Sequence, residues 1–198
     1  MRRAKVERKT RETRVAVELL LEGRGASRLQ TGIPFFDHML DQLARHGGLD
    51  LCVEAEGDLE VDQHHTVEDV GIAIGRALRE ALGDGAGIAR FGHAYAPLDE
   101  ALSRAVIDVC GRRHLEFAAA FPHSRAGGLD AEMVPHFFRS LADAAGLVVH
   151  LHCLHGQNAH HIVESLFKAF ALALRAAIAR TGETAPRSTK GALSEDAT

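Results

Sequence analysis

The 198-residue sequence has little cysteine and few large aromatic side chains: three cysteines, one tyrosine and no tryptophan. Cys52, Cys110 and Cys153 are odd in number and far apart, which argues against a disulfide framework and favours reduced thiols in the cytoplasm. Long apolar runs are missing, so we expect no membrane helix, and the charged segment 1–13 does not have the apolar stretch of a secretory signal. The net charge of −4, with dispersed basic residues, argues against binding to nucleic acid.

Histidine is plentiful instead, and it is arranged as a repeat. The runs His64-His65-Thr66-Val67-Glu68 and His160-His161-Ile162-Val163-Glu164 share one pattern, and each follows a lone histidine, His38 or His136, at nearly the same offset. A single run of this kind is more often a helix cap or a surface feature. Two copies in matching contexts indicate an internal duplication that keeps a metal-binding set.

The repeat supplies six imidazoles and two carboxylates, enough for two metal ions with four protein ligands each. On a helix, the first histidine and the glutamate of a run share one face, whereas the second histidine points about 100° away. One run can therefore serve two different ions. Imidazole and carboxylate ligands without thiolate suit divalent manganese, iron, cobalt, nickel or zinc, and the carboxylates favour manganese.

The hydrophobic pattern predicts a similar order of elements in both halves of the chain. Alternating apolar residues indicate strands, apolar residues spaced three and four apart indicate helices, and glycines mark helix ends. The strands are expected at 14–21, 49–55, 101–109, 114–120 and 147–154, and the helices at 35–46, 66–82, 131–145 and 162–179.

This order predicts an α+β fold, a two-layer sandwich of two duplicated β-β-α-β-α halves related by a pseudo-two-fold axis. The repeats are expected at about 1–92 and 93–182 of a single domain, followed by a tail at about 183–193. All eight candidate ligands lie near the starts of helices. Because groups on related halves often meet a neighbouring chain across an interface, we expect sites shared between subunits.

Several motifs follow one another in a fixed order along the chain. They are FDHML at 36–40, HHTVED at 64–69, APLDEAL at 96–102, PHFF at 135–138, NAHHIVE at 158–164 and STKG at 188–191. With them the chain resembles the imidazoleglycerol-phosphate dehydratase family of histidine biosynthesis over about residues 3–193. The resemblance implies a metal-dependent hydro-lyase that converts imidazole glycerol phosphate to imidazole acetol phosphate and water. It also implies two Mn²⁺ per active site and a homo-oligomeric shell of twenty-four subunits, with active sites formed between chains.

A two-metal site suits this chemistry. No carbonyl adjoins the carbon that loses its proton, so the activation must come from the imidazole ring of the substrate. Two metal ions on the ring nitrogens favour the imidazolate, which can expel the neighbouring hydroxyl and give a diazafulvene-like intermediate. The next carbon then loses its proton, and the resulting enol tautomerises to the ketone.

The resemblance also implies a role for each matching residue. The implied metal ligands are His38, His64, His65, Glu68, His136, His160, His161 and Glu164; the acid/base residues are Glu12 and, as a weaker candidate, Asp99; and the substrate-binding residues are Glu12, Gln42, Arg90, Arg112, Lys168, Ser188, Thr189 and Lys190. The residues alone also allow plainer interpretations. Glu12 is then a solvated charge at a strand start, Lys168 is the partner of Glu164 in a helical ion pair, and 188–191 is a disordered tail.

Two other functions would use the same ligands. A binuclear metallohydrolase holds its ions about 3.5–4 Å apart to make a bridging hydroxide, which is closer than an imidazole ring can bridge. A metal store or a structural metal site needs no phosphate pocket beside the ions. His150 and His152 alternate on an expected strand and are a candidate for a further, minor metal site.

Overall fold

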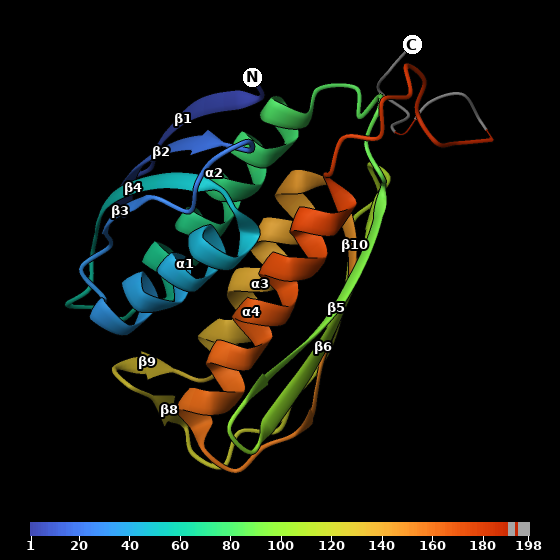
Figure 1. Ribbon diagram of the computed structural model, residues 1–198. Coiled ribbons are helices and arrows are strands. Elements are labelled where there is room, and N and C mark those ends of the chain that lie inside the picture. Colours follow the sequence, from blue (N-terminus) through green and yellow to red (C-terminus); the bar gives the residue numbers. More distant parts are fainter. Residues whose placement is uncertain (190–192, 194–198) are drawn as a thin grey trace.

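The computed structural model of the protein describes residues 1–189 and residue 193. Two β-sheets enclose two layers of helices (Figure 1). The first half contains β1 (Arg3–Lys9), β2 (Thr13–Leu20), β3 (Ser27–Gln30), α1 (Pro34–Gly47), β4 (Asp50–Gly57) and α2 (His64–Leu82). The second half contains β5 (Phe91–Leu98), β6 (Ala101–Val109), β7 (His114–Ala118), β8 (Arg125–Ala126), β9 (Leu129–Asp130), α3 (Met133–Ala145), β10 (Leu147–His155) and α4 (Ala159–Ala177).

The two halves have the same sheet topology. The strand orders are β1-β2-β4-β3 in the first half and β5-β6-β10-β7 in the second. In each sheet the first three strands of this order pair antiparallel, and the last strand pairs in parallel. This equivalence confirms the predicted α+β fold of duplicated halves. The structure adds β1, β3 and β5 to the predicted strands, together with the short β8–β9 hairpin.

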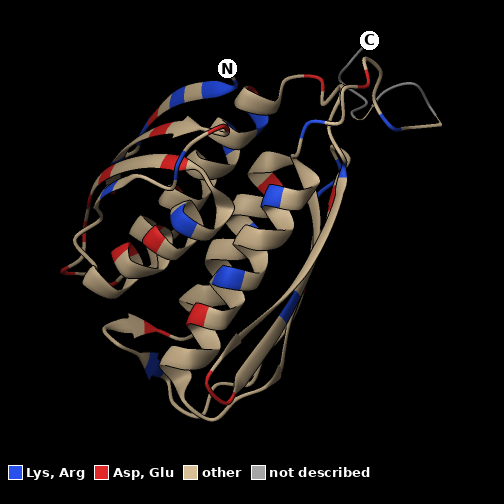
Figure 2. Cartoon of the chain, in the orientation of Figure 1, with Lys and Arg blue, Asp and Glu red and all other residues tan. Residues whose placement is uncertain are grey.

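Each half forms the two predicted layers because its sheet buries one face. Along β2, Val15, Val17 and Leu19 point inward and are buried, while alternate residues are exposed or half-buried. Charged residues mark the strands of the first sheet (Figure 2). The helices pack on the inner, apolar face of each sheet, and the two helical layers meet in the middle of the molecule (Figure 1).

The helices pair across the two halves, with α1 against α4 and α2 against α3. Five phenylalanines fill the space between them and are at most 1% exposed: Phe36, Phe137, Phe138, Phe167 and Phe170. Their rings lie 4.7–5.3 Å apart between centroids. Each such side chain contributes about 1.5–3 kcal/mol of burial free energy. This core fixes the helix starts of one half against those of the other.

Both α1 and α3 end at a glycine in the left-handed conformation, Gly48 (φ 66°) and Gly146 (φ 70°). Such a residue stops a helix at low cost because glycine has no Cβ to clash there. After these equivalent helix ends, the chain continues directly into β4 and β10. Among the described residues, none of the helices combines the length and the apolar character that a membrane span requires.

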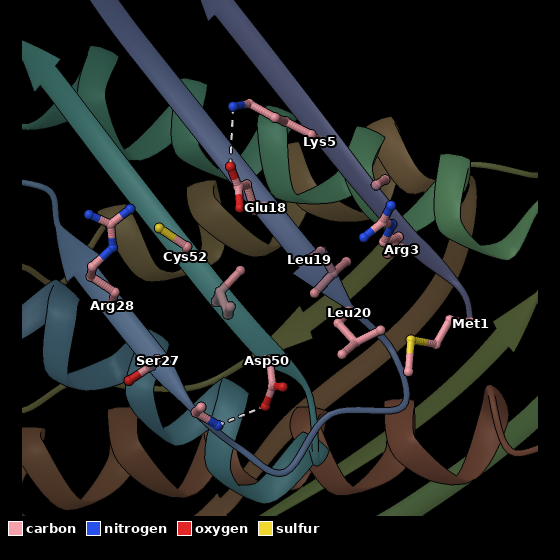
Figure 3. Close-up of a pocket in the computed structure, with 13 residues that line it drawn as sticks. Met1, Arg3, Lys5, Glu18, Leu19, Leu20, Ser27, Arg28, Asp50 and Cys52 are labelled. Carbon is pink, nitrogen blue, oxygen red and sulfur yellow. Dashed lines mark hydrogen bonds and ion pairs between the residues drawn. The ribbon is translucent and has the colours of Figure 1, made fainter.

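A hollow of about 630 Å³ lies on the outer face of the first sheet (Figure 3). Residues of β1, β2, β3 and β4 line it, among them Lys5 with its ion pair to Glu18. None of the predicted site residues lines this hollow. The predicted metal ligands lie elsewhere, near the helix starts between the sheets.

Candidate metal centres and active site

Three predicted ligands converge where α1 meets α4. His38 lies in the second turn of α1, and His160 and Glu164 lie four residues apart at the start of α4. The Nε2 atoms of His38 and His160 are 3.1 Å and 3.0 Å from Glu164 Oε2. One ligand atom from each residue lies within 4.8 Å of the others, so a single divalent ion can reach all three. We call this group the first set.

A second set lies where α2 meets α3. His64 and Glu68 are four residues apart at the start of α2, and His136 lies in the first turn of α3. The rings of His64 and His136 are 4.2 Å apart between centroids, and His136 Nε2 is 3.5 Å from Glu68 Oε1. Burial lowers the pKa of His136, and the nearby His64 lowers it further. His136 therefore stays neutral at pH 7, the form that binds a metal ion.

The donor atoms of these sets fit divalent metal ions. His136 Nε2 is buried and has no hydrogen-bond partner within the described part of the chain, a cost that a bound cation would remove. Each set joins two imidazoles and one carboxylate, and it leaves further coordination positions for other ligands. Among residues 1–189 and 193, these are the groups of three or more metal-binding side chains that lie this close together.

Each set contains residues of both halves. The lone histidine comes from one half, and the first histidine and the glutamate of the paired run come from the other. This exchange follows from the packing of α1 on α4 and of α2 on α3. The sequence pattern identified these residues but did not indicate which of them would lie together.

The second histidine of each run lies outside its set, as the helical rotation predicts. His65 Nδ1 is 3.0 Å from Asp58 Oδ2, and its Nε2 is 3.8 Å from Glu12 Oε1. His161 Nδ1 is 2.7 Å from Glu100 Oε2, and its Nε2 is 3.7 Å from Asp99 Oδ2. Each set therefore contains three of the four protein ligands that we expected for one ion.

The carboxylates of Glu12 and Asp99 are equivalent in position relative to the second histidines. Their side chains are 54% and 74% exposed, so both can meet a molecule from outside the chain. Asp99 has a positive φ of 47° in the turn between β5 and β6. Glu12 directly precedes β2, and its backbone N–H donates to Thr10 Oγ1.

Lys168 distinguishes the first set from the second. Its Nζ lies 2.6 Å from Glu164 Oε1, one helical turn further along α4. Burial raises the pKa of Glu164, but hydrogen bonds from Lys168 and His160 outweigh that effect and lower it to about 2. Ile72 stands four residues after Glu68 in the second set, where no such ion pair can form. The first set therefore has a lysine paired directly with its glutamate, and the second set has no lysine at the equivalent position.

A cleft of about 600 Å³ adjoins the first set at the start of α4. His160, His161, Glu100 and Arg125 of the β8–β9 hairpin are among the residues that line it. Asn158 caps α4 by accepting hydrogen bonds from the backbone N–H groups of His160 and His161. Gln42 Oε1 lies 3.2 Å from His46 Nε2, and its expected place beside the same pocket stays a prediction.

The predicted phosphate-binding arginines lie in another part of the molecule. Arg90 donates from Nε to Asp108 at 2.8 Å, Arg112 reaches Asp108 at 3.5 Å, and Arg90 also donates to the carbonyl of Arg187. Ser188 and Thr189 follow in the same segment, so the structure brings together Arg90, Arg112 and the start of the tail. Lys190 lies outside the described residues.

The arginine cluster and the first set lie at opposite ends of α4. The backbone N–H of Arg90 donates to the carbonyl of Ala177, the last residue of α4, whereas His160 is in the first turn. At a rise of 1.5 Å per residue, the 17 residue steps from His160 to Ala177 span about 25 Å. Figure 1 shows the same separation, because β5 begins beside the end of α4. One chain cannot bring both groups to one small substrate.

Sequence reasoning did not single out Asp58 and Glu100, which contact the two outer histidines. Glu100 stood beside the candidate Asp99, and Asp58 stood in a polar loop, so neither had a signal of its own. Of the minor metal candidates, His150 and His152 have ring centroids 6.2 Å apart, and His152 Nδ1 accepts a hydrogen bond from Arg104.

The chain resembles known proteins over almost its whole length. The sequence model described as imidazoleglycerol-phosphate dehydratase matches residues 31–174. Proteins of that name from Halorhodospira halophila and Anaeromyxobacter dehalogenans are each 57% identical to the chain; they cover 97% of it, and 98% and 92% of their own lengths are matched.

Two solved structures have the same fold. The imidazoleglycerol-phosphate dehydratase of Staphylococcus aureus superposes with a TM-score of 0.82 at 36% identity, covering 90% of this chain and 99% of its own. The enzyme from Pyrococcus furiosus, in complex with (S)-C348, gives a TM-score of 0.81 at 34% identity, covering 94% and 99%. The chain belongs to the imidazoleglycerol-phosphate dehydratase family, hydro-lyases of histidine biosynthesis.

Proposed function

We propose that this protein is a metal-dependent dehydratase that converts imidazole glycerol phosphate to imidazole acetol phosphate and water, with two Mn²⁺ ions at each active site. The observation that carries the proposal is the pair of equivalent three-residue sets, each made of two imidazoles and one carboxylate. Their neutral nitrogen and anionic oxygen donors suit Mn²⁺ and other divalent transition metals. The unpaired thiols of Cys52, Cys110 and Cys153 support a place in the cytoplasm.

The active sites in this proposal form between chains of a homo-oligomer. His65 and His161 lie outside the sets of their own chain and are only partly exposed, with Nε2 atoms near the exposed Glu12 and Asp99. Each supplies the fourth protein ligand of an ion held by a neighbouring chain. The separation of about 25 Å along α4 supports the same conclusion for the phosphate-binding residues. A closed shell of twenty-four subunits, as the family resemblance implies, repeats one such contact many times.

The residues divide the chemistry between them. When bound, the two metal ions would hold the substrate's imidazole ring and stabilise its deprotonated form. The carboxylates of Glu12 and Asp99 stand beside the outer histidines, where one can accept the carbon-bound proton and return it during the final tautomerisation. Arg90, Arg112, Ser188, Thr189 and Lys190 bind the phosphate, Lys168 supplies positive charge beside the first set, and Gln42 borders the site.

Turnover with and without metal tests this function. The protein is stripped with a chelator, dialysed, and assayed through the ultraviolet absorbance of the enolised ketone product. We expect no turnover without metal and full turnover once about two Mn²⁺ per chain have bound. Release of inorganic phosphate would instead indicate a metallohydrolase. Tight binding of Mn²⁺ without any turnover would indicate a metal store, and full activity of the stripped protein would overturn the proposal.

A further inference from the structure

Two carboxylates that do not belong to the three-residue sets hold the two outer histidines. Asp58 presents both oxygens to His65 Nδ1, at 3.1 Å and 3.0 Å. Glu100 presents Oε2 to His161 Nδ1 at 2.7 Å. In both cases the carboxylate engages Nδ1, and Nε2 is the nitrogen that remains for a ligand. The two outer histidines therefore have the same arrangement in the two halves.

Glu100 is itself held in place. Its other oxygen, Oε1, accepts hydrogen bonds from the backbone N–H groups of Gln157 and Asn158, at 3.0 Å and 2.8 Å. Asn158 in turn caps α4. The carboxylate thus ties the β5–β6 turn to the start of the helix that carries His161. A group restrained at both oxygens can restrain the imidazole that it contacts.

The two carboxylates come from different places in their halves. Asp58 directly follows β4, the third strand in its sheet order, whereas Glu100 lies in the turn between β5 and β6. The residue that directly follows β10 is Gly156, which has no side chain to make the contact that Asp58 makes after β4. Duplication of one half alone would have copied a single arrangement. The two halves instead make the same contact to Nδ1 with carboxylates from different positions. This indicates that the site requires the contact.

A carboxylate at Nδ1 selects one tautomer of a neutral imidazole. The proton resides on Nδ1, where it is donated to the carboxylate, and Nε2 keeps its lone pair. An imidazole in the other tautomer presents an N–H at Nε2 and cannot bind a metal ion there. The same contact fixes the ring plane, because the side chain can no longer rotate freely about χ2.

We propose that Asp58 and Glu100 are positioning residues, which hold His65 and His161 with Nε2 directed toward a metal ion of a neighbouring chain. This inference rests on the proposed metal-dependent function. Neither carboxylate touches the substrate, and both act through the histidine that they contact. Carboxylate partners of metal-bound histidines typically change metal affinity or activity by 10–100-fold when removed.

The test compares Glu100→Gln and Asp58→Asn with Glu116→Gln, a control that removes the same charge from the exposed face of β7. Mn²⁺ affinity is measured by competition with a chelating indicator. We expect about 10–100-fold weaker binding for the two test variants and wild-type affinity for the control. If Glu100→Gln does not fold, Asp58→Asn carries the test alone. Wild-type affinity in a folded test variant would overturn the inference.

A second readout detects the tautomer directly. In metal-free protein labelled with ¹⁵N-histidine, studied at an alkaline pH because Glu100 raises the pKa of His161, the nitrogen shifts of His161 should report Nδ1–H in the wild type and a mixture of tautomers in Glu100→Gln. A purely structural role for Glu100 would leave the tautomer unchanged. His161→Ala separates the two hypotheses. If it retains wild-type Mn²⁺ affinity, the proposed ligand role of His161 fails; if it loses affinity while Glu100→Gln does not, only the positioning role fails.

Discussion

Replacing Thr13 by valine should destabilise the protein and slow its chemistry, because Thr13 connects the turn that carries Glu12 to the core. Its hydroxyl donates to Asp69 Oδ2, and Asp69 also accepts from Arg8 Nε at 2.8 Å. Thr10 Oγ1 completes the network by lying 3.2 Å from Thr13 Oγ1 and accepting from the N–H of Glu12. Thr13 and Asp69 are 5% and 4% exposed, so water cannot replace the lost bond.

The expected loss follows from these contacts. Valine keeps the shape of threonine but leaves a buried carboxylate oxygen without a donor, which costs about 2–3 kcal/mol. For a chain of this length, that lowers the thermal midpoint by roughly 5–10 °C. A less firmly held Glu12 should reduce kcat by about tenfold or more, while Mn²⁺ content stays the same.

Chemical denaturation, metal analysis and steady-state kinetics measure these effects together. Ser103→Ala is the matched control, because it removes a buried hydroxyl contact of 2.7 Å between Ser103 and Ser165, which both lie in the second half. It should cost about 1 kcal/mol with kcat unchanged. A Thr13→Val protein with the expected loss of stability but a wild-type kcat would refute the argument that this network positions a catalytic Glu12.

Three further predictions test other parts of the structure. The metal-free protein should lose stability as the pH falls from 4.5 toward 2, because the pKa of Glu164 is about 2 in the folded chain and 4.5 in the unfolded one. Urea unfolding should show that the stability of Glu164→Gln depends less on pH, and an equal pH dependence in the two proteins would contradict this. Gly57→Ala should lower the free energy of unfolding by about 2 kcal/mol or more, because the new Cβ would lie 2.0 Å from Thr66 Oγ1. Adding Thr66→Ala should restore part of that loss, and a double variant as unstable as Gly57→Ala would mean that the clash with Thr66 is not the cause. Arg90→Ala should raise KM by about tenfold or more with unchanged Mn²⁺ content, since it removes a charge-assisted contact to phosphate, and an unchanged KM would exclude Arg90 from the phosphate site.

The duplication was the strongest signal in the sequence, and it led to the fold. Strand β1 was missed because Val6 is its one buried residue, so a single apolar side chain marked its inner face. Strand β3 has four residues and none of them is buried, which leaves no hydrophobic pattern to detect. Both strands are defined by their backbone pairing with neighbours distant in sequence, and a local pattern does not contain that information.

The candidate site shows the same limit. The helical rotation between His64 and His65 correctly separated the inner from the outer histidine of the run. The partner of each inner histidine depends on how α1, α2, α3 and α4 pack, which involves contacts such as His64 to His136, 72 residues apart (136 − 64), and His38 to Glu164, 126 residues apart. The distance from Arg90 to His160 was also unpredictable, because it is set by the length of α4 and by the return of β5 to the end of that helix.

Mixing two impaired variants, assayed at a substrate concentration far below the raised KM of Arg90→Ala, tests the central claim that each active site combines residues of different chains. Arg90→Ala retains both three-residue sets, and His160→Ala retains the arginine cluster. The two proteins are stripped of metal, mixed in equal amounts, and reassembled with Mn²⁺. If one chain supplies the metal-binding set and another supplies Arg90, about one quarter of the sites contain both intact groups, and about that fraction of wild-type activity returns. A mixture no more active than the mean of its two separate components, although reassembled and loaded with Mn²⁺, would contradict the account.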